Sequence, residues 1–535
     1  MGAEGTRGAG LTVSASRHRG PPLAVGAIGV LAGLKLALHV AVNLITPYEF
    51  HRDELLYLAM GRHLRLWSMD FPPAIALLAQ AARAVVGDSL VGLRMVPALA
   101  GTGVVILAAL VARELGGGWR AQVLAALCVI GSPLFLRSAN LFQPVVLDQL
   151  TWMLALLALA RLLGGYGPGS WLVLGLALGL GLLVKFSIGV IGVAITLAIL
   201  FSRLRRALRT PWPWAALVLA LAIGSPSLVG QIRLGFPILD QLATLRVSQL
   251  ERVTAIDFLF GQILWGPSTL LAVAGLAGLL WSHRLEAFRG LGVACVAAFL
   301  LLLLLHGKAY YVGPVYPALF AAGAVQVEAL GESTTAEFVN WGTVTVLVAY
   351  ALVISPLGLP YLWPLRMVVY VQALGLTEAV RTNTGELGEL PQDYADMIGW
   401  KQQAEAVARV YDSLPADQRA EVVILAGNYG EAGALELYGP RYRLPPPVSP
   451  AGSYWFFGPG PRPGRVVLAI GLDPAALALG FRSVREVGRV GHRWAVAEER
   501  DVPITVAMKP RRTLQEVWPS LGGPRSGAGA RAAKQ

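Results

Sequence analysis

The sequence has few charged residues and only two cysteines, and each shortage excludes a class of protein. Of the 535 residues only 14% are charged, whereas a soluble globular protein carries about 25%. Cys128 and Cys295 both lie inside apolar runs, so they predict neither a disulfide nor a metal site. The chain also lacks the His-Glu-x-x-His, Cys-x-x-Cys, Walker and Gly-x-Ser-x-Gly motifs. Their absence argues against a zinc protease and an ATP-driven pump.

Long apolar runs recur between residues 23 and 355 and predict an α-helical polytopic membrane protein. The runs must be helical, because bilayer hydrocarbon offers no water to the backbone. The first run is too long for the apolar region of a cleavable signal peptide, and we expect none. About eleven spans are predicted, at 23–45, 95–112, 121–136, 145–163, 171–184, 187–201, 214–229, 258–280, 291–305, 312–327 and 341–354.

The net charge of +12 raises the possibility of a nucleic-acid partner. The arginines mostly flank apolar runs, however, which is typical of topology signals and of contacts with anionic membrane lipid. Their alternation places the N-terminus in the cytoplasm, with the strongest inner cluster at 203–209. The inner loop 331–340 disagrees, since it has acids and no lysine or arginine, but carboxylates count for little in this rule. We therefore expect a multi-pass protein of the cell (inner or plasma) membrane and no nucleic-acid partner.

Composition divides the chain into four parts. Residues 1–22 are predicted to be a disordered cytoplasmic tail, 23–365 a transmembrane domain with a long outer loop at 46–94, 366–521 a small extracytoplasmic α/β domain, and 522–535 a disordered tail. In the outer loop, 54–67 and 74–86 read as interfacial amphipathic helices separated by Pro72-Pro73. In the distal domain we expect helices at 401–414 and 431–437, and strands at 422–425, 466–470 and 494–496.

The outer loop gathers the polar side chains His51, Arg52, Asp53, Glu54, Tyr57 and Asp70. The simplest interpretation is a solvated loop or a helix start, because aspartate caps helices and glutamate favours a first turn. Counting spans, however, places the acidic stretch, Lys185 and the segment 306–308 on the same outer face. Scattered surface charges would fall on either face with about equal chance, so the coincidence favours a functional site.

Cationic and aromatic candidates lie at the outer ends of later spans. They are Arg137, Asp148, Lys185, His306, Lys308, Tyr310 and Tyr311. Together with His51, Arg52 and Tyr57 of the outer loop, they are the candidates for binding the phosphate of a donor or another part of the substrate. Lys185 is equally well explained as a lysine that snorkels from a short turn, and the tyrosines as an aromatic belt. The functional alternative is that Lys185 and Lys308 bind a lipid phosphate, with Arg137 as a weaker third cation and Asp148 as a carboxylate that orients it.

An acidic group opposite basic groups is the minimal site for transfer of a sugar from a phosphate. The attacking hydroxyl needs a carboxylate base. The phosphate leaving group needs only bound cations to stabilise its charge, and no general acid. The sequence contains this pair of patches and no rival constellation.

The chain resembles the bacterial branch of the polyprenyl-phosphate-sugar-dependent glycosyltransferases with the GT-C fold. These are relatives of the protein O-mannosyltransferases (glycosyltransferase family 39) and of the lipid A aminoarabinose transferase. The matching stretches are HRDELLYLAMGRHL at 51–64, MDFPPAIALLA at 69–79, LLVKFSIG at 182–189, HGKAYYVGPVYPALFAAGA at 306–324, AGNYGEAGALELYG at 426–439 and SYWFFGPG at 453–460.

The resemblance implies that Asp53 is the catalytic base and that Glu54 and Asp70 are its supporting carboxylates. It also implies that Lys185 and Lys308 contact the phosphate of an undecaprenyl-, decaprenyl- or dolichyl-phosphate sugar, and that transfer inverts the anomeric centre. No cofactor follows from it. Acidic residues near such a site can hold a divalent ion, but no metal-ligand spacing is present and we assign no metal ligand. Protein, lipid A, cell-wall glycan and a small glycolipid all remain open as the extracytoplasmic acceptor.

Two other classes of function compete with sugar transfer. A solute transporter or lipid flippase commonly shows paired halves with broken helices. The sequence shows no such pairing, and its acids cluster in one outer loop rather than in mid-span. The third class is a membrane scaffold without catalysis, whose distal domain binds a partner.

Overall fold

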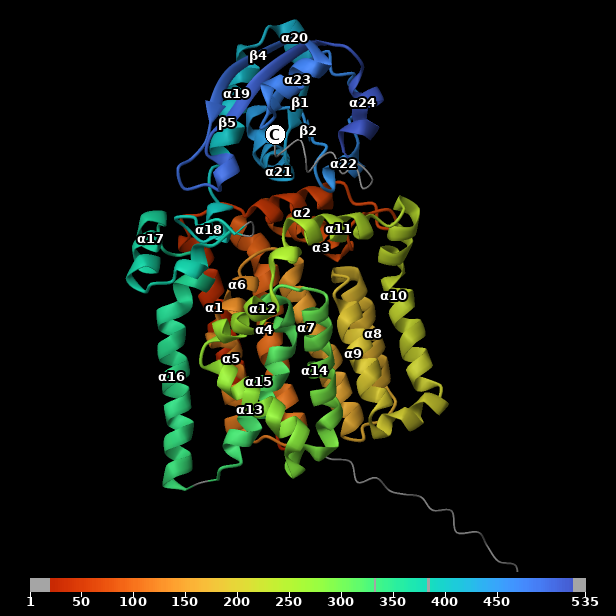
Figure 1. Ribbon diagram of the computed structural model, residues 1–535, viewed down its shortest axis with the longest axis vertical. Helices are drawn as coiled ribbons and strands as arrows, with labels where there is room; N and C mark the ends of the chain where they lie inside the picture. The colour runs from red at the N-terminus through yellow and green to blue at the C-terminus, as the bar shows by residue number, and fades with distance from the viewer. Residues whose placement is uncertain (1–19, 332, 383–384, 523–535) are drawn as a thin grey trace, which may run out of the picture.

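The computed structural model describes residues 20–331, 333–382 and 385–522. The two predicted tails, 1–22 and 522–535, lie outside these residues except for 20–22 and 522. Three layers follow one another along the longest axis of the molecule (Figure 1). A bundle of long helices forms the first layer, short helices lying across its end form the second, and an α/β unit from the C-terminal part forms the third.

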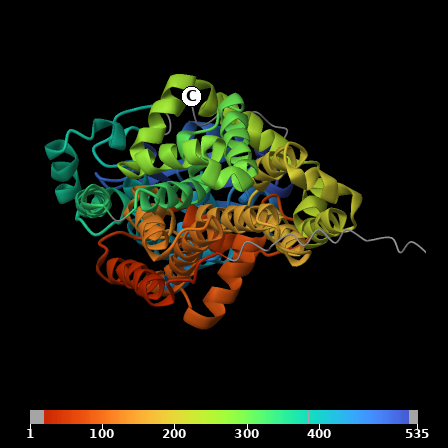
Figure 2. The same ribbon diagram turned by 90° about the horizontal axis from the view of Figure 1, so that it is seen from below.

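The bundle contains twelve helices of the described chain. They are α1 (Val25–Ile45), α4 (Leu90–Glu114), α5 (Trp119–Gly131), α6 (Pro133–Ser138), α7 (Pro144–Leu163), α8 (Gly169–Val184), α9 (Ile188–Leu200), α10 (Trp212–Leu234), α13 (Ser268–Trp281), α14 (Arg289–Leu304), α15 (Tyr316–Glu328) and α16 (Thr334–Gly358). Two of them, α5 and α6, follow each other with one residue between them. In the view from below, α1 (red) lies at the rim of the bundle (Figure 2).

Six helices of the described chain are long and apolar enough to cross a membrane, or up to eight if each bent pair counts as one span. A helical multi-pass membrane protein is therefore confirmed, but the predicted count of eleven spans is not. Several bundle helices, such as α5 and α8, are apolar but shorter than a full crossing.

Two predicted spans are broken in the structure. The span predicted at 121–136 is divided into α5 and α6, because Pro133 cannot continue the hydrogen bonding of the preceding helix. The span predicted at 258–280 is divided into α12 (Ala255–Phe260), a 3-10 helix η3 (Gly261–Trp265) and α13. Gly266 and Pro267 separate the last two. Gly266 has a φ of 70°, which a right-handed helix does not contain, and Pro267 has no N–H to continue the hydrogen bonding of the preceding turn.

The middle layer consists of α2 (Arg52–Arg62), α3 (Ala74–Val86) and α11 (Pro237–Ser248), which lie across the end of the bundle (Figure 1). The helix predicted at 74–86 is confirmed. The helix predicted at 54–67 is shorter and ends at Arg62. Its apolar residues Leu55 and Leu58 are buried against protein rather than lipid.

The C-terminal unit is built on a five-stranded mixed sheet in the order β2-β1-β3-β5-β4. The strands β1 and β2 and the strands β1 and β3 pair in parallel, and the other two pairs are antiparallel. The strands are β1 (Val422–Ala426), β2 (Pro447–Val448), β3 (Val466–Ile470), β4 (Phe481–Val490) and β5 (Val502–Pro510). The helices of this unit are α19 (Trp400–Ser413), α20 (Ala416–Glu421), α21 (Tyr429–Tyr438), α22 (Tyr454–Phe457), α23 (Pro474–Gly480) and α24 (Leu514–Leu521). Before it, α17 (Pro364–Ala373) and α18 (Gln392–Ala395) lie beside the end of the bundle (Figure 1), where they pack against Tyr48 and Leu141.

The predicted helices at 401–414 and 431–437 and the predicted strands at 422–425 and 466–470 are confirmed, within a few residues, as α19, α21, β1 and β3. The strand predicted at 494–496 is wrong, because these residues belong to the irregular connection between β4 and β5. Neither β4 nor β5 was predicted. The strand β4 is partly exposed and carries arginine and glutamate, so it lacks the apolar signature of a buried strand.

The middle layer and the C-terminal unit share one hydrophobic core. It joins Leu55 of α2, Ile75 of α3, Trp400 of α19 and Ile424 of β1, all of which are buried. The C-terminal unit is therefore packed onto the outer loop and is not a module on a flexible tether.

Polar connections gather at the two ends of the bundle. At the end far from the sheet, Arg161 pairs with Glu114 at 3.2 Å, and the backbone N–H of Gly118 donates to Glu328 at 2.6 Å. The connections that carry Asp53 and Lys185 lie at the other end, beneath the C-terminal unit (Figure 1). The connections that carry Asp53 and Lys185, which were predicted to share one face, thus lie at the same end of the bundle.

Candidate active site

The beginning of α2 is held by a capping box. His51 precedes the helix, and its Nδ1 accepts a hydrogen bond from the backbone N–H of Asp53 at 3.1 Å. In return, Glu54 Oε2 accepts from the backbone N–H of His51 at 2.7 Å. Asp53 and Glu54 therefore occupy a first helical turn, where the helix dipole favours negative charge. The role of each carboxylate then depends on the partners of its oxygens.

The Glu54 carboxylate is fully buried and is paired with Arg94 of α4. Arg94 donates to it from Nη2 at 2.6 Å and from Nε at 3.0 Å, and the backbone N–H of Phe142 donates at 2.7 Å. Burial alone would raise the pKa of Glu54, but the Arg94 guanidinium and the donated hydrogen bonds hold the pKa below its usual range. Both oxygens of Glu54 are therefore used in hydrogen bonds that hold the start of α2 against α4 and Phe142.

The Asp53 carboxylate is half-buried and is held by two donors from different parts of the chain. Gln143 Nε2, in the connection before α7, donates to Oδ2 at 3.2 Å. The Tyr429 hydroxyl, at the start of α21, donates to Oδ1 at 3.0 Å. A carboxylate has about four positions for accepting hydrogen bonds. Asp53 thus combines a fixed orientation with remaining capacity to accept a proton.

Asp70 and Tyr57 lie on the side of the outer loop that faces the C-terminal unit. Asp70 Oδ2 accepts from the Ser453 hydroxyl at 2.7 Å, and burial raises the pKa of Asp70. The hydrogen bond of Asp70 is thus to Ser453, and neither Asp53 nor Glu54 is its partner. The Tyr57 ring lies 5.8 Å from that of Phe71, and burial, followed by the negative charge of Asp53, raises the pKa of Tyr57 well above its ordinary value.

A short relay of contacts links the Asp53 segment to Arg137. His51 Nε2 lies 3.8 Å from Asp393 and 3.9 Å from Asp396, both in or next to α18. Asp393 accepts from Arg137 Nε at 2.7 Å. Burial would raise the pKa of Asp393, but Arg137 and His51 together hold it well below the usual range.

Arg137 has unused hydrogen-bonding capacity. Both of its Nη atoms are buried and have no hydrogen-bond partner in the described part of the chain. Its guanidinium also lies over the Tyr394 ring, 5.4 Å from the centroid. A guanidinium with two buried nitrogen atoms that lack partners is suited to binding an anion that accepts two parallel hydrogen bonds.

Lys185 lies between α8 and α9, and its Nζ is 5.2 Å from the centroid of the Tyr311 ring. Its charge also acts on Asp148 of α7. Asp148 Oδ2 accepts from the Ser187 hydroxyl at 2.8 Å, while its buried Oδ1 has no hydrogen-bond partner among the described residues. The structure thus brings Lys185, Asp148 and Tyr311 together.

The segment from 306 to 311 lies near both Lys185 and the acidic residues Asp53 and Asp393. Lys308 precedes the 3-10 helix η5 (Ala309–Val315); burial lowers the pKa of Lys308, while the charge of Asp393 acts in the opposite direction. Tyr310 packs edge-on against Tyr311 at 4.8 Å. The pKa of Tyr310 is raised well above its usual value by burial first, and also by the charges of Asp393 and Asp53. Lys308 and Tyr310 are therefore within electrostatic reach of the acidic side.

Arg52 and His306 are placed differently from the other candidates. Arg52 faces the C-terminal unit, where it pairs with Glu498 at 2.8 Å and covers the Tyr429 ring at 5.0 Å. It therefore holds this unit on α2 and is not directed toward Lys185 or Lys308. His306 is exposed and has a φ of 54°, so it forms the turn that follows α14.

Sequence reasoning missed the residues that complete the site from a distance in the chain. They are Arg94, Gln143, Asp393, Asp396, Tyr429 and Ser453. Tyr429 and Ser453 lie in two of the stretches that carry the family resemblance, at 426–439 and 453–460, so the sequence did mark both positions. Asp393 had none, because a lone aspartate in a chain with 32 acidic residues is not distinctive.

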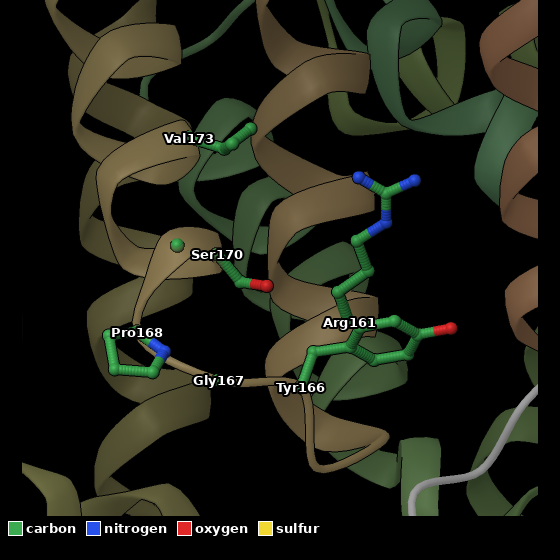
Figure 3. Close-up of a pocket in the computed structure, with 7 residues that line it drawn as sticks. Arg161, Tyr166, Gly167, Pro168, Ser170 and Val173 are labelled. Atoms are coloured by element: carbon green, nitrogen blue, oxygen red, sulfur yellow. The ribbon is translucent and has the colours of Figure 1, made fainter.

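A separate pocket lies at the opposite end of the bundle, between α7 and α8. Figure 3 shows Arg161, Tyr166 and Ser170 among its lining residues, and no predicted site residue lines it. Within the described residues, no group of three or more His, Cys, Asp or Glu side chains is arranged to hold a metal ion.

One part of the chain matches a known family. Residues 70–229 match the family described as dolichyl-phosphate-mannose-protein mannosyltransferase. No curated protein sequence matches the chain.

Solved structures confirm the fold class. ArnT from Cupriavidus metallidurans bound to undecaprenyl phosphate is similar, with a TM-score of 0.58 at 15% identity over 90% of this chain and 98% of that chain. The apo oligosaccharyltransferase of Archaeoglobus fulgidus has a TM-score of 0.50 at 14% identity, over 79% of this chain and 64% of that chain. At these identities the likeness concerns the fold alone. An ArnT-like fold, in which a helical membrane part is followed by a C-terminal α/β unit, is therefore confirmed.

Proposed function

We propose that the protein is an integral-membrane glycosyltransferase that moves a sugar from a polyprenyl-phosphate donor to a hydroxyl of an extracytoplasmic acceptor. One observation carries the proposal. A chain of contacts connects the backbone of Asp53, through His51 and Asp393, to Arg137, whose two buried Nη atoms have no hydrogen-bond partner among the described residues. The family match over residues 70–229 supports the class of reaction, and the ArnT-like fold supports the membrane setting.

Asp53 acts as the base in a single displacement. It removes the proton from the acceptor hydroxyl while the hydroxyl oxygen attacks the anomeric carbon from the face opposite the phosphate. The bond from the anomeric carbon to the phosphate oxygen breaks, and its electron pair stays on the polyprenyl phosphate. The products are an inverted glycoside, the polyprenyl phosphate and a proton on Asp53, which passes to water. No general acid is required, because the phosphate leaves as a stable anion.

The cationic side stabilises the departing phosphate. Arg137 supplies two parallel donors, and Lys308 and Lys185 supply positive charge. Tyr311 lies beside Lys185, and its neighbour Tyr310 is within electrostatic reach of Asp53, so both rings are available to accept hydrogen bonds from, or pack against, the sugar. Asp148 orients Lys185 by charge attraction. We assign His51 and Glu54 to the support of the Asp53 loop rather than to contact with the donor.

The orientation in the membrane follows from the two ends of the bundle. Arg161 and the cluster at 203–209 belong to the end far from the C-terminal unit. Because positive residues stay in the cytoplasm, we assign the C-terminal unit and the site to the extracytoplasmic face.

Two experiments test the proposal. Lipids extracted from a deletion strain should contain an accumulated polyprenyl-phosphate sugar, which identifies the donor, and the conjugate that is missing identifies the acceptor. The purified full-length protein should release polyprenyl phosphate from that donor in the presence of the acceptor. The variant Asp53→Asn should lose at least about 100-fold in rate, as expected for loss of a general base.

A matched control is Asp88→Asn, in the same outer loop. Asp88 pairs with Arg83 at 2.5 Å and is 38% exposed, so its loss removes one charge without touching the site. This variant should retain transfer. Full activity of Asp53→Asn would refute the assigned base. Flux of an intact lipid or solute across vesicles, with no covalent product, would establish a transporter instead.

A further inference from the structure

We infer that the C-terminal unit completes the active site, and that Tyr429 is a positioning residue that holds the Asp53 carboxylate in its productive orientation. The inference rests on the proposed function, since it assigns Asp53 as the base. It is carried by the hydrogen bond from the Tyr429 hydroxyl to Asp53 Oδ1 at 3.0 Å, which joins residues 376 positions apart in the chain.

Close helix packing brings Tyr429 to this place. The helix α21 lies against α2 through two glycines. A Cβ on Gly433 would come within 2.7 Å of Leu55 Cβ, and a Cβ on Gly430 within 2.8 Å of Arg52 Cγ. Both distances are shorter than any ordinary contact between carbon atoms. The two helices therefore approach as closely as they do because both positions lack a side chain.

The start of α21 is itself fixed, which determines the direction of the Tyr429 side chain. Asn428 Oδ1 accepts from the backbone N–H groups of Gly430 at 2.8 Å and Glu431 at 3.0 Å. From the other side, the Arg52 guanidinium lies over the Tyr429 ring, 5.0 Å from its centroid. The hydroxyl is thus held against Asp53 by a helix cap and a stacked cation.

Tyr429 is suited to donate and not to titrate. Burial, followed by the negative charge of Asp53, raises its pKa well above the ordinary value, so the hydroxyl keeps its proton at physiological pH. Gln143 donates to the other oxygen of Asp53 at 3.2 Å. Two donors on two different oxygens fix the plane of the carboxylate and leave its remaining lone pairs for the proton of the acceptor hydroxyl.

The test compares Tyr429→Phe with Tyr454→Phe in the full-length protein. The Tyr454 hydroxyl also donates to a carboxylate in the interface between α2 and the C-terminal unit, at 2.7 Å to Glu436, but not to Asp53. Both variants therefore lose one tyrosine-to-carboxylate hydrogen bond. Kinetics with the donor lipid recovered from the deletion strain should show a kcat about tenfold lower for Tyr429→Phe, with KM for the donor changed less than twofold. Tyr454→Phe should keep the wild-type kcat.

A second measurement does not depend on sugar transfer. Purified wild-type protein and both variants are treated with a water-soluble carbodiimide and glycine ethyl ester, and modification of the Asp53 peptide is followed by mass spectrometry. Loss of a donor leaves the carboxylate less restrained, so Asp53 should be modified several times faster in Tyr429→Phe than in wild type, and at the wild-type rate in Tyr454→Phe.

The outcomes separate this inference from the proposed function. If no donor is turned over by the wild type, the proposed function fails, and the carbodiimide rates alone decide whether Tyr429 restrains Asp53. Equal effects of the two variants on kcat would show a merely structural hydrogen bond and overturn the inference. An unchanged rate of Asp53 modification in Tyr429→Phe would also overturn it.

Discussion

Loss of Arg94 should destabilise the protein more than any loss of a surface cation. In the variant Arg94→Met, the Glu54 carboxylate stays fully buried but loses the donors at 2.6 Å and 3.0 Å. Its remaining donors are the backbone N–H groups of His51 and Phe142, both at 2.7 Å. An uncompensated buried charge costs about 3–5 kcal/mol of the free energy of unfolding. Methionine keeps much of the volume of the arginine stem, so the cavity contribution is small.

The free energy of unfolding is measured by titrating sodium dodecyl sulfate into mild detergent micelles. Arg83→Met is the control, because its partner Asp88 is 38% exposed, and such a pair contributes about 1 kcal/mol or less. The double variant Arg94→Met/Glu54→Gln removes the buried charge and keeps an acceptor for the helix cap, so it should be more stable than Arg94→Met alone. The reasoning is refuted if Arg94→Met costs no more than Arg83→Met, or if the double variant shows the sum of both single losses.

The same pair predicts a dependence on pH. Arg94 holds the pKa of Glu54 below its ordinary value of 4.5 against the effect of burial. The folded state then binds the proton less tightly than the unfolded state. Its contribution to stability is therefore fully present above about pH 4.5 and is lost as the pH falls through the lower pKa of the folded protein.

Three more changes have defined outcomes. Burial raises the pKa of Asp396 to about 6, so the folded protein binds this proton more tightly than the unfolded chain. The stability that the protonated Asp396 contributes is therefore lost as the pH rises through 6. In the same detergent titration, Asp396→Asn should be more stable than wild type at pH 8 and equal to it at pH 4. Gly433→Ala should cost about 1–3 kcal/mol, because its Cβ would lie 2.7 Å from that of Leu55, whereas Gly480→Ala, with open space around it, should cost less than 1 kcal/mol. Arg137→Lys should raise KM for the donor lipid about tenfold, since lysine keeps the charge but not the parallel donors, and an unchanged KM would remove Arg137 from the phosphate site.

The sequence was sufficient for features that depend on local pattern. Apolar runs predicted the helical membrane part, but the spans at 121–136 and 258–280 were predicted as continuous and are broken in the structure. The helix at 74–86 matched α3 because its apolar positions recur at helical spacing and Pro72-Pro73 marks its start. The gathering of Asp53 and Lys185 at one end followed from span parity, which needs only the order of the apolar runs.

Features that depend on long-range packing escaped prediction. The partners of Asp53 come from positions 143 and 429, and no periodicity in the sequence indicates that α21 lies on α2. The assignment of Arg52 to the donor failed to anticipate Glu498, which lies 446 residues away and is one of many glutamates. The strands β4 and β5 were both missed. β4 is partly exposed and charged, so its pairing with β5, rather than its own composition, makes it a strand.

The first helix shows why a span that looks like a plain anchor can bear on the site. Lys35, His39 and Asn43 recur every four residues on one face of α1, and all three are buried. Asn43 Oδ1 accepts from Arg94 Nη1 at 3.2 Å, so this polar face reaches the ion pair beneath α2. The loop that carries Asp53 is therefore held from below by α1 and α4 and from above by α21. For the single displacement that we propose, the base must keep its orientation while the donor binds, and contacts on both sides of the Asp53 loop meet that condition.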